Sequence, residues 1–168
     1  MNAVIDLVPL AGVDGAAVEA LLDRAFEPER RGRTAYKVRG DALPVPALSF
    51  AATNGGVLAG TVQCWPVAFF PDGGAAVPLT MVGPVAVAPE RQRDGVGRRL
   101  MDRALAAAAV ERLDDGLVLI GDPGYYGRFF GFTPERTGAW RLPGPVERHR
   151  LLARGSRVPD GAGALGPA

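Results

Sequence analysis

The chain has 168 residues, enough for one domain of ordinary size. Hydrophobic residues make up 48% and charged residues 22%, which is typical of a soluble globular protein rather than a disordered or fibrous one. The formal net charge of +1 argues against a dedicated nucleic-acid-binding protein, and no apolar run approaches the roughly 18 residues that span a membrane. One cysteine, Cys64, excludes an internal disulfide and a multi-cysteine metal site. The first residues lack the pattern of a secretory signal, so we expect a cytoplasmic protein.

The first part of the chain predicts a strand followed by a helix. Residues 3–8 alternate weakly between apolar and polar side chains, as a half-buried strand does. Asp14 is a candidate N-cap for a helix that runs to about Phe26 and ends before Pro28, which cannot continue it. The charged residues 29–33 that follow predict a loop or a frayed helix start.

The middle of the chain predicts antiparallel strands. A strand is expected over 48–53, and Asn54-Gly55-Gly56 is a strong signal for the turn of a hairpin. Its partner strand, 57–70, contains Pro66, which cannot donate to a ladder, so the strand must bulge or lie at an edge there. Residues 80–87 are largely apolar, which is typical of a strand buried on both faces.

The second half of the chain predicts two helices among short strands. Apolar residues spaced three and four apart predict a helix over 95–111, and a second helix is expected over 123–129. Residues 156–168 are rich in Gly, Pro and Ala and predict a flexible C-terminal tail, so we expect one domain over 1–155. Short strands are expected over 117–120, 132–136, 139–142 and 146–152.

The most informative segment joins the strand 80–87 to the following helix. A polar turn with two glycines, Gly95 and Gly97, leads into the helix, where the first backbone N–H groups have no helical partner and the dipole favours negative charge. Because glycines let another group approach the backbone closely, this turn predicts an anion site suited to a phosphate or pyrophosphate. The arginines that would add charge-assisted contacts are Arg91, Arg93, Arg98 and Arg99.

Two common nucleotide-binding motifs do not fit this turn. A P-loop needs Gly-Lys-Ser/Thr, and here Arg98 follows Gly97. A dinucleotide fingerprint needs a third glycine three residues after the second, where this chain has Leu100. The remaining alternative is that Gly95 and Gly97 only form a tight strand-to-helix turn.

The run Gln92-Arg93-Asp94-Gly95-Val96-Gly97 resembles the Gln/Arg-x-x-Gly-x-Gly/Ala signature of the GNAT superfamily of acetyl-CoA-dependent N-acetyltransferases. It stands between a strand and a helix, as it does in that family. A second segment, 117–132, resembles the family's fifth strand, its fourth helix and the Gly-Phe pair before its sixth strand. Its Gly-Asp-Pro-x-Tyr-Tyr run is similar to that of an uncharacterised bacterial subgroup.

The resemblance covers about residues 3–152 and implies the fold of that family. We therefore expect an α/β (α+β) architecture, the GNAT acyl-CoA N-acyltransferase fold. Its central sheet would be mixed and mostly antiparallel, with about seven strands, splayed between the fourth and fifth and flanked by about four helices.

The resemblance also implies a site for acetyl-CoA as cosubstrate, without a metal. Val85, Ala86 and Val87 would pair through main-chain groups with the pantetheine arm, and an N–H near Val85 would polarise the thioester carbonyl. Tyr126 would contact the cosubstrate and protonate the departing thiolate, a role that suits a phenol with a pKa of ~10. The pyrophosphate would be held by backbone N–H groups in the turn formed by Gln92, Arg93, Asp94, Gly95, Val96, Gly97 and Arg98.

The hypothesis for function is an acyltransferase that moves the acetyl group of acetyl-CoA to a primary amine by direct attack in a ternary complex. Two departures from the family keep an alternative open. Four residues, rather than three, separate Tyr126 from Gly131-Phe132, and residues 82–87 carry no carboxylate where many relatives keep a general base. Glu90 follows that strand and is expected to be a solvated surface charge. The alternative is a catalytically weak CoA-binding or sensory module of the same fold, and a third interpretation is an acyltransferase for another acyl group.

The acceptor is expected to be the amine of a small molecule or peptide, recognised by residues in 26–48, 63–80 and 136–148. Arg30 lies in a basic cluster of the first segment, which would either face an acidic acceptor or form a solvated surface. Cys64 has no neighbouring histidine to activate it, which argues against an acetyl-carrying nucleophile. We expect no nucleic-acid or membrane partner, and a homodimer is the one protein partner considered.

Overall fold

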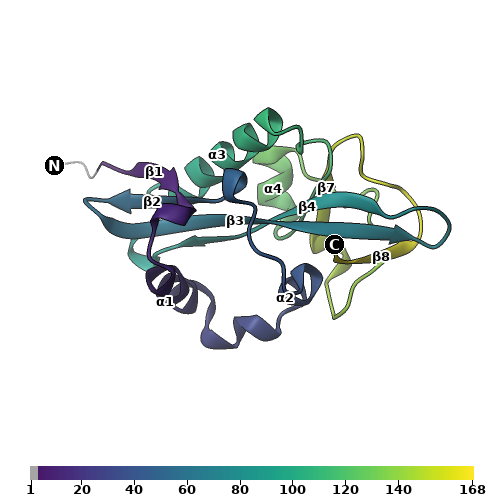
Figure 1. The fold of residues 1–168 in the computed structure, drawn as a ribbon, viewed down its shortest axis with the longest axis horizontal. Coiled ribbons are helices and arrows are strands. Elements are labelled where there is room, and N and C mark those ends of the chain that lie inside the picture. Colours follow the sequence, from purple (N-terminus) through teal and green to yellow (C-terminus); the bar gives the residue numbers. More distant parts are fainter. Residues whose placement is uncertain (1–3) are drawn as a thin grey trace. The chain divides into compact units, whose positions relative to one another are not determined.

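The computed structural model describes residues 4–168, which form an α/β fold with an open, mixed sheet (Figure 1). The helices are α1 (Gly15–Phe26), α2 (Thr34–Arg39), α3 (Val96–Val110) and α4 (Pro123–Phe130). The strands are β1 (Asp6–Pro9), β2 (Phe50–Asn54), β3 (Val57–Pro71), β4 (Val77–Val87), β5 (Leu117–Ile120), β6 (Trp140–Arg141), β7 (Leu151–Arg154) and β8 (Gly163–Pro167). Short 3-10 turns, η1 to η5, cover Leu10–Gly12, Pro28–Gly32, Pro46–Leu48, Pro89–Arg91 and Arg148–Arg150.

The strand order is β1-β2-β3-β4-β5-β7, with β8 on β3 and β6 on β8. Most pairs are antiparallel, whereas β4 with β5 and β6 with β8 run parallel. The mixed, mostly antiparallel sheet with four helices confirms the fold expected from the sequence, with eight strands in place of about seven. Ala3, the predicted start of the first strand, lies outside the described residues, and β1 begins at Asp6.

Residues 4–168 divide into two compact units. The first unit comprises the residues up to Arg31, Pro44–Cys64 and Gly83–Glu111. The second comprises Gly32–Leu43, Trp65–Val82 and Arg112–Ala168.

In the first unit, α1 forms where the sequence predicts it. The Asp14 side chain caps the helix by accepting a hydrogen bond from the Ala16 N–H at 3.2 Å. The apolar face of the helix then packs on Ala86 of β4 and on Ala88, which follows that strand. That face consists of Val18, Leu21 and Leu22.

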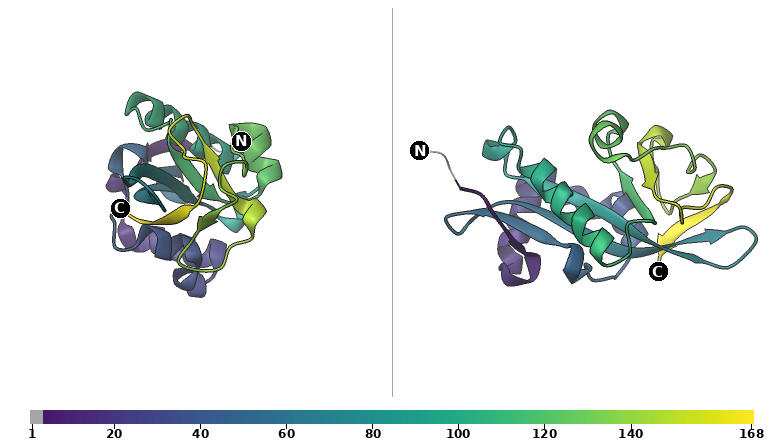
Figure 2. Two further views of the ribbon diagram at one scale, coloured as in Figure 1. Left: turned by 90° about the vertical axis from the view of Figure 1, so that its right-hand side faces the viewer. Right: turned by 90° about the horizontal axis from the view of Figure 1, so that it is seen from above.

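Helix α3 packs along β2 and the first part of β3, as the views in Figure 2 show. At Gly60 of β3, an added Cβ would lie 2.9 Å from both the Ala86 carbonyl oxygen and the Val96 side chain. The strand therefore needs glycine there for the helix to come close. The predicted hairpin is also confirmed, because β2 ends at Asn54 and β3 begins at Val57.

In the second unit, a hydrophobic core forms around two stacked rings. Phe69 and Trp140 lie with their ring centroids 4.3 Å apart, and Trp140 is fully buried. The core residues around them come from α2, β3, β4, β5, β7 and the C-terminal segment, and include Val38, Met81, Val118, Leu151, Val158 and Leu165.

Residues 156–168, for which a flexible tail was expected, contain the strand β8. It pairs antiparallel with β3 from Val67 to Pro71, and Leu165 on it is only 2% exposed. Gly163 lies directly against the Phe69 ring, where a Cβ would clash. The glycine and alanine residues of this segment, which indicated a flexible tail, therefore allow it to pack closely against β3. The expected domain boundary between residues 155 and 156 stays a prediction.

Two of the short predicted strands differ from the structure. The expected strand over 132–136 is reduced to a single bridge between Thr133 and Ala153, because Pro134 interrupts the ladder and Thr137 turns the chain by donating to the Pro134 and Leu151 carbonyls. The expected strand over 146–152 begins later, at Leu151, because a 3-10 turn occupies Arg148–Arg150.

Candidate active site

The turn before α3 leaves the start of that helix without a side-chain cap. Gly95 occupies the cap position with φ of 72°, a left-handed conformation that favours glycine. The first hydrogen bond of the helix runs from the Arg99 N–H to the Gly95 carbonyl at 3.1 Å. The backbone N–H groups of residues 96–98 precede that bond and lie at the positive end of the helix dipole.

The side chains of this turn divide into a buried and an exposed set. Val96 is 1% exposed and packs toward β3, so only its backbone is available to a ligand. Arg91 lies 3.4 Å from Asp94, a weak pair across the turn. The exposed residues of the turn are Gln92, Arg93, Asp94, Gly95 and Arg98, and their charges sum to a positive value.

Strand β4 presents main-chain groups on the side away from β3. Ala88 donates its N–H to the Ala59 carbonyl of β3 at 2.8 Å. Because backbone groups alternate direction along an antiparallel strand, the N–H and C=O groups of Val87 and Val85 point away from β3. Ala86 between them points its main chain back toward β3 and its side chain into the core.

The parallel ladder between β4 and β5 ends early. It joins Thr80 to Leu117 and Met81 to Val118, and among residues 4–168 no further β4–β5 pair is formed, although β4 continues to Val87. Val85 and Val87 are half-buried, unlike the fully buried Met81 earlier in the strand.

Gly97 brings the turn and the strand together. A Cβ at this position would lie 3.4 Å from Val87 and 3.8 Å from Val85, so these valines pack beneath the first turn of α3. The main-chain groups of β4 and the uncapped helix start therefore lie side by side in the first unit. An elongated ligand could pair with the strand at one end and place an anion on the helix at the other.

The second unit carries Tyr126, on helix α4. The helix is capped by Asp122, whose carboxylate accepts from the Gly124 N–H at 3.1 Å, and Pro123 occupies its first position. The Tyr126 ring rests on Gly121, where an added Cβ would lie 2.5 Å from the ring. The helix runs on to Phe130, so the extra residue after Tyr126 extends the helix and forms no bulge.

The environment of Tyr126 keeps its hydroxyl protonated. Burial raises the pKa of the Tyr126 phenol above its usual value, and the nearby Tyr125 adds to the shift. The two rings meet edge to face with centroids 5.0 Å apart. Among residues 4–168, no hydrogen bond to the Tyr126 side chain is formed, which leaves its proton available to a ligand.

Glu90 and Cys64 lie in contrasting environments. Glu90 is exposed and paired with Arg24 at 2.6 Å, and the hydrogen bond from Arg24 lowers the pKa of the Glu90 carboxyl. Burial raises the pKa of the Cys64 thiol to about 12, which makes it a poor nucleophile. In residues 4–168, no group of three His, Cys, Asp or Glu side chains could hold a metal ion.

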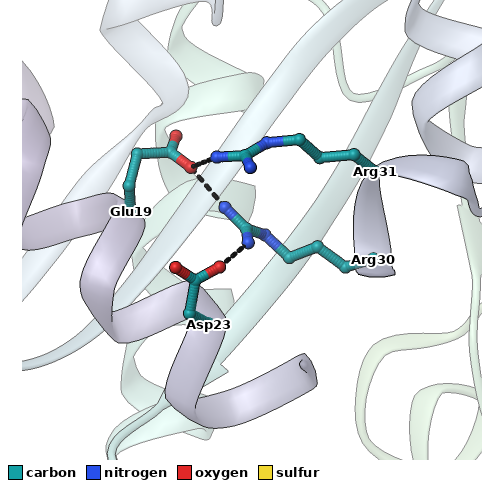
Figure 3. Close-up of polar contacts among 4 residues, drawn as sticks. All are labelled: Glu19, Asp23, Arg30 and Arg31. Atoms are coloured by element: carbon teal, nitrogen blue, oxygen red, sulfur yellow. Dashed lines mark hydrogen bonds and ion pairs between the residues drawn. The ribbon is translucent and has the colours of Figure 1, made fainter. Parts of the chain in front are cut away.

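The sequence reasoning missed the role of Arg30, which is 1% exposed rather than solvated. Its guanidinium forms ion pairs with Glu19 and Asp23 of α1, and Arg31 also contacts Glu19 (Figure 3). We call these four residues the Arg30 cluster. The only signal in the sequence is the pair of acidic residues four apart on α1, which lie on one face of the helix.

The family model of the acetyltransferase (GNAT) domain matches residues 12–134, most of the chain. The chain belongs to the GNAT acetyltransferase family. The family predicted from the motifs is therefore confirmed. None of the curated proteins compared with this GNAT chain matches it.

Solved structures of GNAT proteins share the fold. One is the GNAT family N-acetyltransferase YhbS from Escherichia coli, solved in complex with CoA, which superposes with a TM-score of 0.71 at 23% sequence identity. The match covers 97% of this chain and 89% of the YhbS chain. A GNAT family acetyltransferase from Brucella melitensis, in complex with acetyl-CoA, gives a TM-score of 0.62 at 27% identity. That match covers 93% of this chain and 99% of the Brucella chain. The ribosomal-protein-S18-alanine N-acetyltransferase from E. coli gives 0.55 at 18% identity, covering 89% and 90%.

The predicted site residues of this GNAT chain fall in two places. The residues from Val85 to Arg98 come together in the first unit, and Tyr126 belongs to the second. Within residues 4–168, no helix is both long and apolar enough to cross a membrane.

Proposed function

We propose that this chain is an acetyltransferase that moves the acetyl group of acetyl-CoA to a primary amine. One observation carries the proposal. The β4 segment from Val85 to Val87, which has no ladder to β5, lies next to the uncapped start of α3. A pantetheine arm can hydrogen-bond to the strand while its pyrophosphate accepts from backbone N–H groups of the turn. The GNAT relatives solved with CoA or acetyl-CoA support this choice of cosubstrate.

Each residue has a specific task in the proposed reaction. The turn 92–98 holds the pyrophosphate, and Ala86 keeps β4 fixed against the core while Val85 and Val87 offer main-chain groups. The Val85 N–H polarises the thioester carbonyl, where negative charge develops as the amine attacks. Tyr126 then gives its proton to the departing sulfur, which its raised pKa permits at neutral pH.

The first experiment is calorimetric titration with acetyl-CoA, with NADH as a control ligand. Saturable binding of acetyl-CoA alone is expected. It should be lost in Gly97→Trp, whose side chain would fill the space over Val85 and Val87. Gly15→Trp is the matched control, because Gly15 lies in the first turn of α1 with nothing within 4 Å of an added Cβ. Equal loss in both variants, or no binding by the unmodified protein, would refute the proposal.

A second candidate function is a CoA-binding module with little catalysis. It is favoured by the ion pair between Arg24 and Glu90, which removes the carboxylate closest in sequence to β4 as a general base. Release of CoA in the presence of an amine separates the two functions. An acetyltransferase releases CoA at a rate that rises with amine concentration, whereas a binding module shows acetyl-CoA binding without that release.

A further inference from the structure

The 3-10 turn before β7 carries a basic side chain that no carboxylate neutralises. In this turn, Arg148 donates to the Trp140 carbonyl, and His149 lies 3.4 Å from Glu147. Arg150 is the third residue of the turn, and it is half-buried. In the part of the chain that the structure describes, its guanidinium forms no ion pair. Because a partly buried charge is costly unless it serves an interaction, the surroundings of Arg150 indicate its role.

The ladder between β5 and β7 brings Arg150 next to Gly121. The ladder pairs Ile120 with Leu151, and one step further the Gly121 N–H donates to the Arg150 carbonyl at 2.9 Å. Residues opposite each other on neighbouring antiparallel strands share a face of the sheet, so Arg150 and Gly121 lie on the same face. Their chain neighbours Ile120 and Leu151 pack in the hydrophobic core of the second unit. Since side chains alternate along a strand, Arg150 points to the face away from that core.

The ring of Tyr126 covers this second face at Gly121. Gly121 has no side chain, and the ring occupies the space above it, where an added Cβ would lie 2.5 Å from a ring carbon. The side chain of Arg150 therefore starts from the strand position beside the ring. Both Tyr126 and Arg150 belong to the second unit, and both are half-buried rather than enclosed.

The groups around Tyr126 act on its hydroxyl in opposite directions. Burial raises the pKa of the Tyr126 phenol most, and the neighbouring Tyr125 and Asp122 raise it further. The positive charge of Arg150 lowers the pKa of the same phenol, because it favours the phenolate. Asp122 is fixed as the cap of α4 by the Gly124 N–H. Arg150 thus opposes the influences that make Tyr126 a weaker acid.

We propose that Arg150 makes Tyr126 an effective general acid, by stabilising the negative charge that remains on the Tyr126 oxygen when its proton moves to sulfur. This inference rests on the proposed function, which gives Arg150 no role. In the step itself, the amine nitrogen bonds to the carbonyl carbon, the C–S bond breaks, and its electron pair goes to sulfur. The sulfur takes the proton from Tyr126. The phenolate then regains a proton from solvent, which receives the one that the amine loses.

The relative strengths of the two acids explain why such a residue is needed. A phenol with an ordinary pKa of ~10 is a weaker acid than a thiol with a pKa of ~8.5, so proton transfer from Tyr126 to the thiolate is unfavourable. Burial adds to this cost, because it disfavours the phenolate. A guanidinium stays protonated and has no proton acceptor of its own, so Arg150 can stabilise the phenolate without competing for the proton. Arg150 is therefore a positioning residue that acts through Tyr126.

The test combines kinetics with a direct measurement on the phenol. In Arg150→Met, which removes the charge from a long side chain, kcat for CoA release should fall about tenfold, equivalent to about 1.4 kcal/mol. The KM for the amine and the acetyl-CoA dissociation constant should change less than about twofold, because Arg150 contacts neither ligand. The Tyr126 Cζ resonance, labelled with carbon-13 and followed between pH 8 and 11, should titrate at higher pH than in the unmodified protein.

Three further variants define the cause of these changes. Arg150→Lys keeps the positive charge and should restore most of kcat and of the titration midpoint. Arg154→Met is the matched control, because Arg154 is half-buried on the same face of β7 but lies opposite Leu117, so the variant should behave like the unmodified protein. Adding Arg150→Met to Tyr126→Phe should cause no further loss of kcat, because the hydroxyl through which Arg150 acts is gone.

The outcomes separate this inference from the proposed function. Absence of acetyl-CoA binding, or of CoA release with every amine, by the unmodified protein would refute the proposed function itself. An unchanged Tyr126 titration in Arg150→Met would overturn only the inference. So would an equal loss of kcat from Arg150→Met with and without the Tyr126 hydroxyl. A raised KM for the amine with an unchanged kcat would also overturn it, because Arg150 would then bind the acceptor.

Discussion

At the scale of single residues, Tyr126 and Cys64 show how burial sets opposite chemical roles. Both side chains have a raised pKa, and burial is the largest cause in each case. For a proton donor, which is the role proposed for Tyr126, a raised pKa preserves the active form. For a thiol such as Cys64, it removes the reactive thiolate.

The role of Tyr126 is tested by Tyr126→Phe, which removes only the hydroxyl. We expect kcat to fall by about 10²–10⁴, the range for loss of a general acid, while the acetyl-CoA dissociation constant changes less than about threefold. Because the pKa of Tyr126 lies above its usual value, activity should not decline through loss of this acid below pH 10. Steady-state kinetics and calorimetry check both points, and an unchanged kcat would show that another group protonates the thiolate.

Cys64 predicts a pH dependence of stability. Burial raises the pKa of its thiol from an ordinary 9.0 to about 12 in the fold, so the stabilisation is complete below pH 9 and is lost as pH rises toward 12. In that window the free energy of unfolding should fall about 1.4 kcal/mol per pH unit more steeply than in Cys64→Ala. Urea unfolding at pH 8, 9.5 and 10.5 measures the slopes. Parallel slopes for the two proteins would contradict the prediction.

At the scale of elements, the sequence predicts a helix or turn correctly where residues within a few positions of one another determine its structure. Asp14 predicted the start of α1, Asn54-Gly55-Gly56 predicted the hairpin, and the turn with two glycines predicted the start of α3. The strand β8 could not be predicted, because its residues, Gly163 to Pro167, have no alternating pattern. Its structure depends on β3 and on the Phe69 ring, which lie far away in the sequence. Arg30 escaped prediction for the same reason, since its carboxylate partners lie on α1.

The contribution of β8 can be measured with Leu165→Ala. Leu165 is 2% exposed within the core of the second unit, so the substitution should lower the free energy of unfolding by about 2–5 kcal/mol. Ala164→Ser, on the less buried adjacent position, should change it by less than about 0.5 kcal/mol. Chemical denaturation gives both values. A Leu165→Ala protein as stable as the parent would mean that the C-terminal segment is a loose tail after all.

At the scale of the whole molecule, the ligand is expected to add stability that the free chain lacks. A ligand present at a hundred times its dissociation constant stabilises the folded state by about 2.7 kcal/mol. For a chain of this length, that corresponds to a rise in melting temperature of roughly 5–10 °C. Thermal unfolding with and without acetyl-CoA measures the shift. Gly97→Trp should abolish it and Gly15→Trp should retain it, so an equal rise in both variants would place the ligand elsewhere.

The site was partly predictable from the sequence at this scale. The order of strand, glycine turn and helix indicated where an anion would bind, because helix geometry alone exposes N–H groups there. The direction of the Val85 and Val87 main-chain groups required the β3–β4 register, and the early end of the β4–β5 ladder required the fold. Buried oxygen atoms that find no hydrogen-bond partner among residues 4–168, such as Thr61 Oγ1 and Gln63 Oε1, can be recognised only once their surroundings are known.

The burial of Cys64 has a practical consequence for every assay of this chain. Since it is the single cysteine and its thiolate is suppressed, the native protein should contribute almost no background to a colorimetric thiol reagent that counts released CoA. The same property makes the unmodified sequence a ready template for site-specific labelling. A cysteine introduced at the exposed Gln92 would be the only reactive sulfur, and a fluorophore attached there could report the arrival of the cosubstrate in real time.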